Sequence, residues 1–131
     1  MKKIVLIAII LLSIAFALYA RVYPTGTPLT GTTDSTVAFV SAFDRNIEAY
    51  DRIMIAIKNT GSSSNTLAYK VIFYPDKDKS YEYVYTDSTQ LTDSGEAIYT
   101  LRNYYYSVDI QVTPTTTDSI TTYTILLNEV K

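Results

Sequence analysis

Residues 104–113 read YYYSVDIQVT and, after the tyrosines, alternate between two kinds of side chain. The even-numbered positions are apolar or aromatic, namely Tyr104, Tyr106, Val108, Ile110 and Val112. The odd-numbered positions are mostly polar, namely Tyr105, Ser107, Asp109, Gln111 and Thr113. Because successive side chains of a β-strand point to opposite faces, the stretch predicts a strand with one buried and one solvated face.

The same period of two recurs along most of the chain. It predicts further strands over residues 36–43, 52–58, 67–74, 81–86, 96–101 and 122–127, rich in β-branched and aromatic residues. In 52–58, for example, Ile53, Ile55 and Ile57 share one face. With 104–113 this makes about seven strands, each of ordinary length.

Clusters of turn-forming residues separate these strands. They lie at 59–66, 75–79, 87–95 and 114–119, a spacing typical of two stacked antiparallel sheets. Residues 44–50 break the alternation and indicate one helical turn or a wide loop between sheets. We therefore predict an all-β protein with an antiparallel β-sandwich domain over residues 36–131, either immunoglobulin-like or jelly-roll-like.

Residues 1–20 differ in kind from the rest. Lys2 and Lys3 precede an uncharged apolar run from Ile4 to Ala20, which as a helix would reach roughly 26 Å at ~1.5 Å per residue. Ala17 and Ala20 offer small residues before a scissile bond, so the segment is either a cleaved signal peptide or a retained hydrophobic helix that anchors the chain in a membrane or an assembly. Both interpretations export the remainder to the extracellular space, the cell surface or a virion surface.

Residues 21–35 are rich in Thr, Pro and Gly and are predicted to form an extended arm. The arm is either a linker or an edge strand that awaits a partner. Our hypothesis is that it adds a strand to the sheet of a neighbouring copy, pairing chiefly through residues 29–36. Val22, Tyr23 and Leu29 are the side chains able to fill pockets there.

Composition excludes several functions. The 131 residues include no His, no Cys and no Trp, so imidazole or thiolate zinc sites and Ser-His or Cys-His nucleophiles cannot form. We expect no enzyme activity and no cofactor. Once Lys2 and Lys3 are set aside, nine basic residues face thirteen acidic ones, and the basic residues are scattered, so nucleic acid is not an expected partner.

Two acidic groups are weak candidates for chemistry. Oxygen-bearing side chains alternate along one loop, as in some calcium sites, at Asp76, Asp78, Ser80 and Glu82. Lys77 and Lys79 interrupt them, so a solvated hairpin turn is the competing interpretation and no metal is predicted. A second group, Asp87, Asp93 and Glu96, indicates a charged loop more than a pair of catalytic carboxylates.

Tyrosine is abundant, with 13 Tyr against 4 Phe. Tyr81, Tyr83 and Tyr85 would form a row on one strand face, and Tyr105 adds a ring on another. Such rows can serve as a platform for a glycan or as a subunit contact. Cross-strand packing of half-buried rings is the alternative explanation.

The N-terminal run and the stretch DRIMIAIKNTGSSSNTLAYKVIFYP (51–75), with a hairpin expected over 53–73, resemble subunits of archaeal surface filaments, the type IV pilin-like and archaellin proteins. Small β-sandwich proteins of virions are similar too. The resemblance implies a structural subunit that associates with copies of itself and reaches a membrane through residues 1–20 if these are not cleaved. The alternative function is a glycan-binding or surface-binding module that uses the tyrosine-rich faces.

Overall fold

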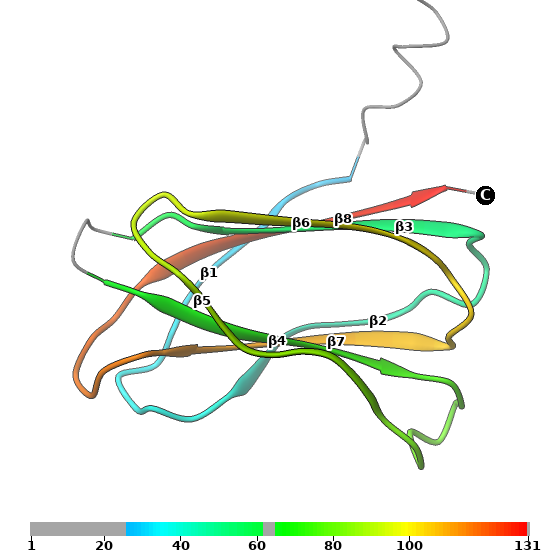
Figure 1. The fold of residues 1–131 in the computed structure, drawn as a ribbon, viewed down its shortest axis with the longest axis horizontal. Helices are drawn as coiled ribbons and strands as arrows, with labels where there is room; N and C mark the ends of the chain where they lie inside the picture. The colour runs from blue at the N-terminus through cyan, green and yellow to red at the C-terminus, as the bar shows by residue number, and fades with distance from the viewer. Residues whose placement is uncertain (1–25, 62–64, 131) are drawn as a thin grey trace, which may run out of the picture.

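The computed structural model describes residues 26–61 and 65–130, and every regular element among them is a β-strand (Figure 1). The strands are β1 (Leu29–Thr32), β2 (Val40–Asn46), β3 (Arg52–Asn59), β4 (Leu67–Tyr74), β5 (Tyr83–Leu91), β6 (Glu96–Arg102), β7 (Ser107–Pro114) and β8 (Thr122–Val130). None of these residues belongs to a helix of the length and apolarity that a membrane span requires. The predicted signal or anchor segment, together with Val22 and Tyr23, lies outside the described residues.

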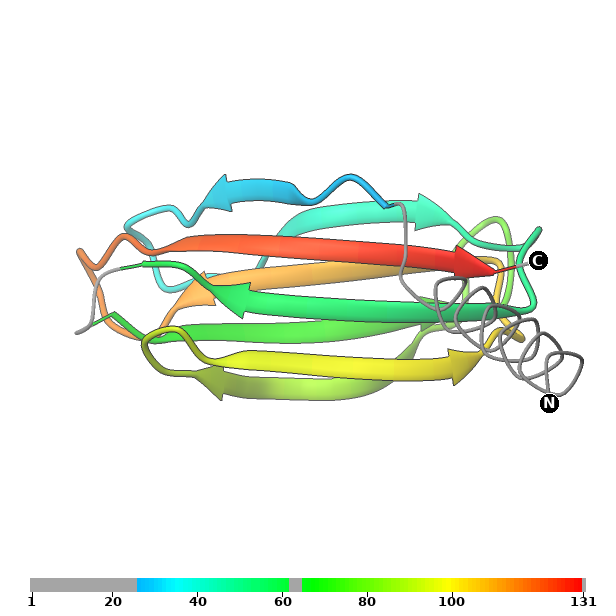
Figure 2. The same ribbon diagram turned by 90° about the horizontal axis from the view of Figure 1, so that it is seen from above.

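The strands form two antiparallel sheets stacked face to face (Figure 1). Sheet A has the order β1-β8-β3-β6, which Figure 2 shows from above, and sheet B has the order β2-β7-β4-β5. Among the described strands, only β4 and β5 are consecutive in sequence and paired as a hairpin; the other connections cross between the sheets. This strand order is that of an eight-stranded jelly roll, so the jelly-roll-like form of the predicted sandwich is the one that occurs.

The inward faces of the strands confirm the predicted alternation. Ile53, Ile55 and Ile57 of β3 are each at most 1% exposed, and Val108 and Ile110 of β7 are fully buried. These side chains meet between the sheets in one apolar core, where roughly 25 cal/mol per Å² of buried apolar surface stabilises the fold. Tyr123, Ile125 and Leu127, which alternate along β8, lie in the same core.

β1 comes from the segment that we predicted to be a linker or an edge strand for a neighbouring copy. Residues Leu29–Thr32 pair with β8 of the same chain, in register from Leu29 opposite Ile125 to Thr32 opposite Thr122. The edge of β8 would otherwise carry unpaired backbone groups, and a Thr-rich segment satisfies them. Gly31 leaves room for the Tyr123 ring, since an added Cβ would lie 2.3 Å from the Tyr123 hydroxyl and the ring would have to move. The sandwich therefore includes residues that we had placed before its start at residue 36.

The hairpin predicted over residues 53–73 is wrong. β3 lies in sheet A and β4 lies in sheet B, so the chain between them crosses from one sheet to the other. The turn-forming residues of this loop are compatible with either path, and their sequence does not distinguish a hairpin from a crossing.

Asn59 holds this crossing together. Its side chain is fully buried, and its Nδ2 donates to the carbonyl oxygens of Asn65 at 2.7 Å and Leu91 at 3.0 Å. Its Oδ1 accepts from the backbone N–H of Gly61 and the hydroxyl of Thr121, both at 2.9 Å. One asparagine thus joins the ends of three connections that meet at this end of the sandwich.

The face of residues 104–113 that we predicted to be solvated is mostly buried in the structure. β7 starts only at Ser107, and its polar side chains Ser107, Asp109 and Thr113 are each at most 5% exposed. β7 lies inside sheet B, between β2 and β4, so neighbouring strands flank its polar side chains on both sides. Asp109 is satisfied there, since it accepts from the Ser41 hydroxyl at 2.6 Å and from the Gln111 amide at 2.8 Å.

The connection between the two sheets that we predicted over residues 44–50 occurs only after Asn46, because the first three of these residues belong to β2. β2 runs on to Asn46, and a tight turn follows in which the Tyr50 N–H donates to the Ile47 carbonyl at 3.1 Å. The Ile47 side chain is fully buried and belongs to the core. The turn is thereby anchored to the core at the end of the sandwich.

Candidate functional site

A two-sheet sandwich has two open sides, where the edge strands of one sheet face those of the other. Here β5 and β6 border one side, and β1 and β2 border the opposite side (Figure 2). Side chains of the described residues fill the first side but leave the second side open, so we look for the candidate site at the second side.

Aromatic rings close the side between β5 and β6. Phe73 stacks on Tyr105 with ring centroids 4.7 Å apart, and Tyr105 stacks on Tyr83 at 5.8 Å. Tyr85 meets Phe73 at 5.9 Å and Tyr99 at 5.4 Å, both edge to face. Such offset and perpendicular contacts contribute beyond area burial, and we call these five rings the aromatic cluster.

The predicted tyrosine row is therefore mostly part of this packing. Tyr83 is 51% exposed and Tyr85 is 38% exposed, but one face or edge of each ring is engaged within the aromatic cluster. Tyr105 belongs to the cluster as well. Tyr81 lies in the loop before β5 and is 74% exposed, so it does not share a strand face with the other two.

Tyr69 and Tyr99 link the two sheets beside the cluster. Their hydroxyl groups form a hydrogen bond across the core, from β4 in sheet B to β6 in sheet A. Burial, together with this hydrogen bond, raises the pKa of Tyr69 well above the ordinary tyrosine value. The Tyr69 side chain is therefore a neutral phenol at every pH near 7.

We expect Tyr69→Phe to lower the free energy of unfolding by about 1–3 kcal/mol, because the Tyr99 hydroxyl would lose its partner. Urea denaturation followed by circular dichroism measures this. Tyr104→Phe is the matched control, since Tyr104 is 77% exposed, and its effect should stay within about 0.5 kcal/mol. Equal effects of the two substitutions would contradict a stabilising link between the sheets.

The side between β1 and β2 is not filled by the chain's own described residues. Leu29 lies opposite the core residue Ile125, and Val40 lies opposite the core residue Val112, so both side chains face the space between the sheets. Yet Leu29 is 41% exposed and Val40 is 55% exposed. The predicted contact residue Leu29 thus lies where an external partner could reach it, and Val37, at 50% exposure, is close by in the chain.

Two cavities open along this side, which we call the open side. One, of about 300 Å³, is lined by Gly26, Thr27, Phe43, Arg45, Leu127, Asn128 and Glu129. The Arg45 Nε and Glu129 Oε1 atoms form an ion pair at 2.9 Å in its wall. The other, of about 180 Å³, includes Val40, Val112 and Tyr123 in its lining. The larger cavity combines the apolar side chains of Phe43 and Leu127 with polar groups and the charged pair, a mixture that suits an amphipathic side chain such as tyrosine.

The loop considered for calcium is a hairpin connection between β4 and β5. The Asp76 carboxylate accepts from the backbone N–H of Ser80 at 2.9 Å and of Tyr81 at 3.3 Å, and the Ser80 contact chiefly lowers its pKa. Within residues 26–61 and 65–130, no three acidic side chains gather as a metal would need, so Asp78 and Glu82 do not join Asp76. The carboxylate of Asp76 instead stabilises its own turn.

The second acidic group is also dispersed. Asp87 forms an ion pair with Lys70 at 3.1 Å, and the hydrogen bond from Lys70 is the main cause of its lowered pKa. Asp93 accepts from the adjacent Ser94 hydroxyl at 3.2 Å, and Glu96 lies opposite Lys58 in the pairing of β3 with β6. The three carboxylates thus do not form a paired site, and Asp87 and Asp93 each have a local partner.

Comparison with known proteins gives a likeness of fold. No protein-family model matches the sequence, and no curated protein does either. The Yersinia pseudotuberculosis-derived mitogen superposes with a TM-score of 0.54 at 11% identity, over 83% of this chain and 88% of that chain. PirA gives a TM-score of 0.51 at 18% identity, over 82% of this chain and 98% of that chain. At such identities the likeness shows a shared β-sandwich and nothing of a shared activity.

A protein of the Bacillus endospore appendages, which are disulfide-linked pili, also aligns with 83% of this chain and 88% of its own, at 9% identity. Its TM-score is 0.44, which is too low to support an argument about fold or function.

Proposed function

We propose that the protein is an exported, non-enzymatic structural subunit that associates with copies of itself in an extracellular filament or a virion. The open side carries this proposal. Core-facing Leu29 and Val40 are exposed there, and two cavities lie between the edge strands. A second copy of the chain that covered this side would bury apolar surface that a single copy leaves in water.

The segment that fits the open side is the part of the arm before Gly26. Residues 29–32 pair with β8 of their own chain and are not available to a neighbouring copy. We therefore place the contact with the neighbouring copy in residues 21–25. Gly26 and Thr27 line the larger cavity, which shows where the described chain begins relative to the open side. The two large side chains of this segment are Val22 and Tyr23.

Tyr23 of a neighbouring copy matches the larger cavity in size and in chemistry. A volume of about 300 Å³ accommodates one tyrosine side chain. Phe43 and Leu127 would contact its ring, and the Arg45–Glu129 pair would meet its hydroxyl. A contact between the arm of one copy and the open side of the next is head-to-tail, and such contacts propagate as a filament unless rotation closes them.

We expect Val40→Asp to abolish or strongly reduce assembly while the domain stays folded, because a charge would enter the contact at a position that is exposed in the single chain. The control is Val84→Asp, which places the same charge on an exposed valine of β5, and it should assemble like the parent protein. Sedimentation velocity and electron microscopy measure assembly, and circular dichroism measures folding.

Tyr23→Ser tests the arm itself and should reduce assembly as Val40→Asp does. If Val40→Asp assembled like the parent, or if Val84→Asp impaired assembly equally, the open side would not be the contact. A change in the stability of the monomer by Tyr23→Ser, with assembly intact, would mean that the arm fills its own open side.

Glycan binding through the predicted tyrosine row gains no support, because Tyr83, Tyr85 and Tyr105 pack in the aromatic cluster. Attachment to a membrane through residues 1–20 stays a prediction that no described residue tests.

A further inference from the structure

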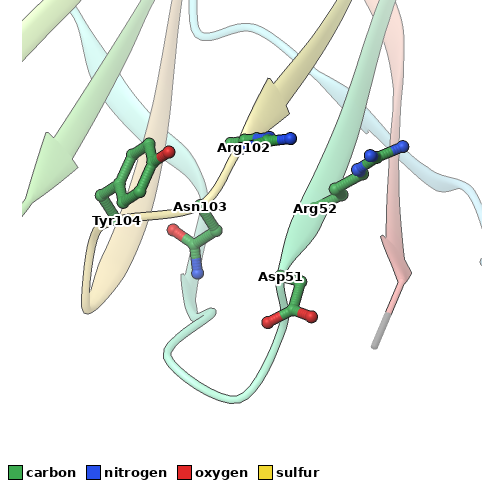
Figure 3. Close-up of a pocket in the computed structure, with 5 residues that line it drawn as sticks. All are labelled: Asp51, Arg52, Arg102, Asn103 and Tyr104. Atoms are coloured by element: carbon green, nitrogen blue, oxygen red, sulfur yellow. The ribbon is translucent and has the colours of Figure 1, made fainter.

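Two arginines stand side by side at one end of sheet A. Arg52 begins β3 and Arg102 ends β6, and they are direct partners in the antiparallel register. Both lie on the outer face of the sheet, since the adjacent Ile53 and Leu101 face the core. Figure 3 shows both side chains extending to the same side from the neighbouring strands.

These arginines form no ion pair within the described part of the chain, although Arg45, Lys70 and Lys79 each pair with a carboxylate. Like charges placed directly opposite each other destabilise a sheet. The contrast is marked in a protein whose net charge is −2. The arrangement therefore concentrates positive charge at a point where a bound anion would relieve the repulsion.

The arginines also line a cavity of about 300 Å³, together with Asp51, Asn103 and Tyr104 (Figure 3). The ring of Tyr104 is 77% exposed, which is unlike the rings of the aromatic cluster. A second cavity of about 270 Å³ shares Asn103 and Tyr104 with the first and is also lined by Glu48, Pro75, Tyr105 and Tyr106. Tyr104 is thus an exposed ring between two adjoining cavities.

Asn103 fixes the shape of this site. Its Nδ2 donates to the backbone carbonyls of Ile47 and Tyr50, and its Oδ1 accepts from the Tyr105 N–H at 2.9 Å. These hydrogen bonds tie the β6–β7 connection to the anchored turn between β2 and β3. A loop held in this way fixes the backbone that carries Tyr104, which lowers the entropic cost of ordering the loop on binding.

We propose that this site binds an acidic polysaccharide through a sugar residue that carries a carboxylate. A guanidinium group matches a carboxylate with two parallel hydrogen bonds, and two such groups stand together here. The exposed Tyr104 ring offers a flat apolar surface for the C–H face of the sugar, and the Asp51 carboxylate can accept from its hydroxyl groups. The adjoining cavity gives room for the next sugar of the chain. This role goes beyond self-association and does not depend on it.

The test is calorimetric titration of the full chain with a trimer of galacturonic acid. We expect saturable binding that weakens as salt is raised, and at least a tenfold loss of affinity in the double variant Arg52→Gln and Arg102→Gln. Tyr104→Ala should lose affinity severalfold. Lys58→Gln is the control for a general effect of charge, because it removes one positive charge at the opposite end of β3, and its affinity should stay within about twofold of the parent.

Several outcomes would overturn the proposal: no saturable binding of the trimer, equal binding of its uncharged methyl ester, or unchanged affinity in the double arginine variant. If inorganic phosphate bound as strongly as the trimer in a competition experiment, the site would be one for small anions. That result would refute the proposal of a sugar ligand. A second readout is stability without ligand, since Arg102→Gln should raise the urea midpoint by removing like charges that face each other. A lowered midpoint would show that the arginines stabilise the fold and do not form a site.

Discussion

Val108→Asp should leave the domain unfolded at room temperature. The Val108 side chain is fully buried between the sheets, and Arg45, which lies opposite it on β2, is already paired with Glu129, so an aspartate there would lose its hydration with little compensation. We expect a loss of at least about 5 kcal/mol in the free energy of unfolding, which is as large as the whole stability of many domains of this size. Circular dichroism and the dispersion of the amide NMR spectrum would both report the loss.

Val84→Asp is the control for this prediction as well. It introduces the same side chain on β5 of the same sheet, at a valine that is 42% exposed. The effect there should be below about 1 kcal/mol. A folded Val108→Asp protein would contradict the assignment of β7 to the centre of the core.

Asn59→Ala should have the second largest effect. The substitution would leave two carbonyl oxygens, one backbone N–H and one hydroxyl without the partner that they have in the native fold. Each orphaned buried group costs about 1–3 kcal/mol, and water would reach some of them, so we expect a loss of about 3–5 kcal/mol in urea denaturation.

Asn128→Ala tests whether the cost belongs to the hydrogen bonds of Asn59. Asn128 is half-buried on the outer face of β8, and its side chain makes no hydrogen bond to the described residues. Its replacement should cost less than about 1 kcal/mol. If Asn59→Ala were equally mild, the crossing from β3 to β4 would be held by the backbone alone.

The sequence predicts the strands and their core faces because these depend on local alternation. Ile53, Ile55 and Ile57, for example, must share a face wherever their strand lies. It does not predict which strands pair. The buried polar face of β7 and the crossing at Asn59 both follow from the strand order, and that order depends on contacts between segments far apart in sequence.

The candidate sites were predictable to a smaller extent. The apolar character of Leu29 indicated a contact residue, but its pairing with β8 in the same chain depends on an edge that only the assembled sheet reveals. Arg52 and Arg102 lie far apart in the sequence, and the register of β3 with β6 alone makes them neighbours. Each arginine is an isolated charge in the sequence, so a shared site could not be predicted from the sequence alone.

Electron microscopy of the native protein, purified from its source without denaturation, tests the central claim most directly. If the chain is a structural subunit, the images should show regular filaments or particles whose repeating unit has the volume of this β-sandwich. A population that remains monomeric at all concentrations, with residues 21–25 intact by mass measurement, would contradict the account.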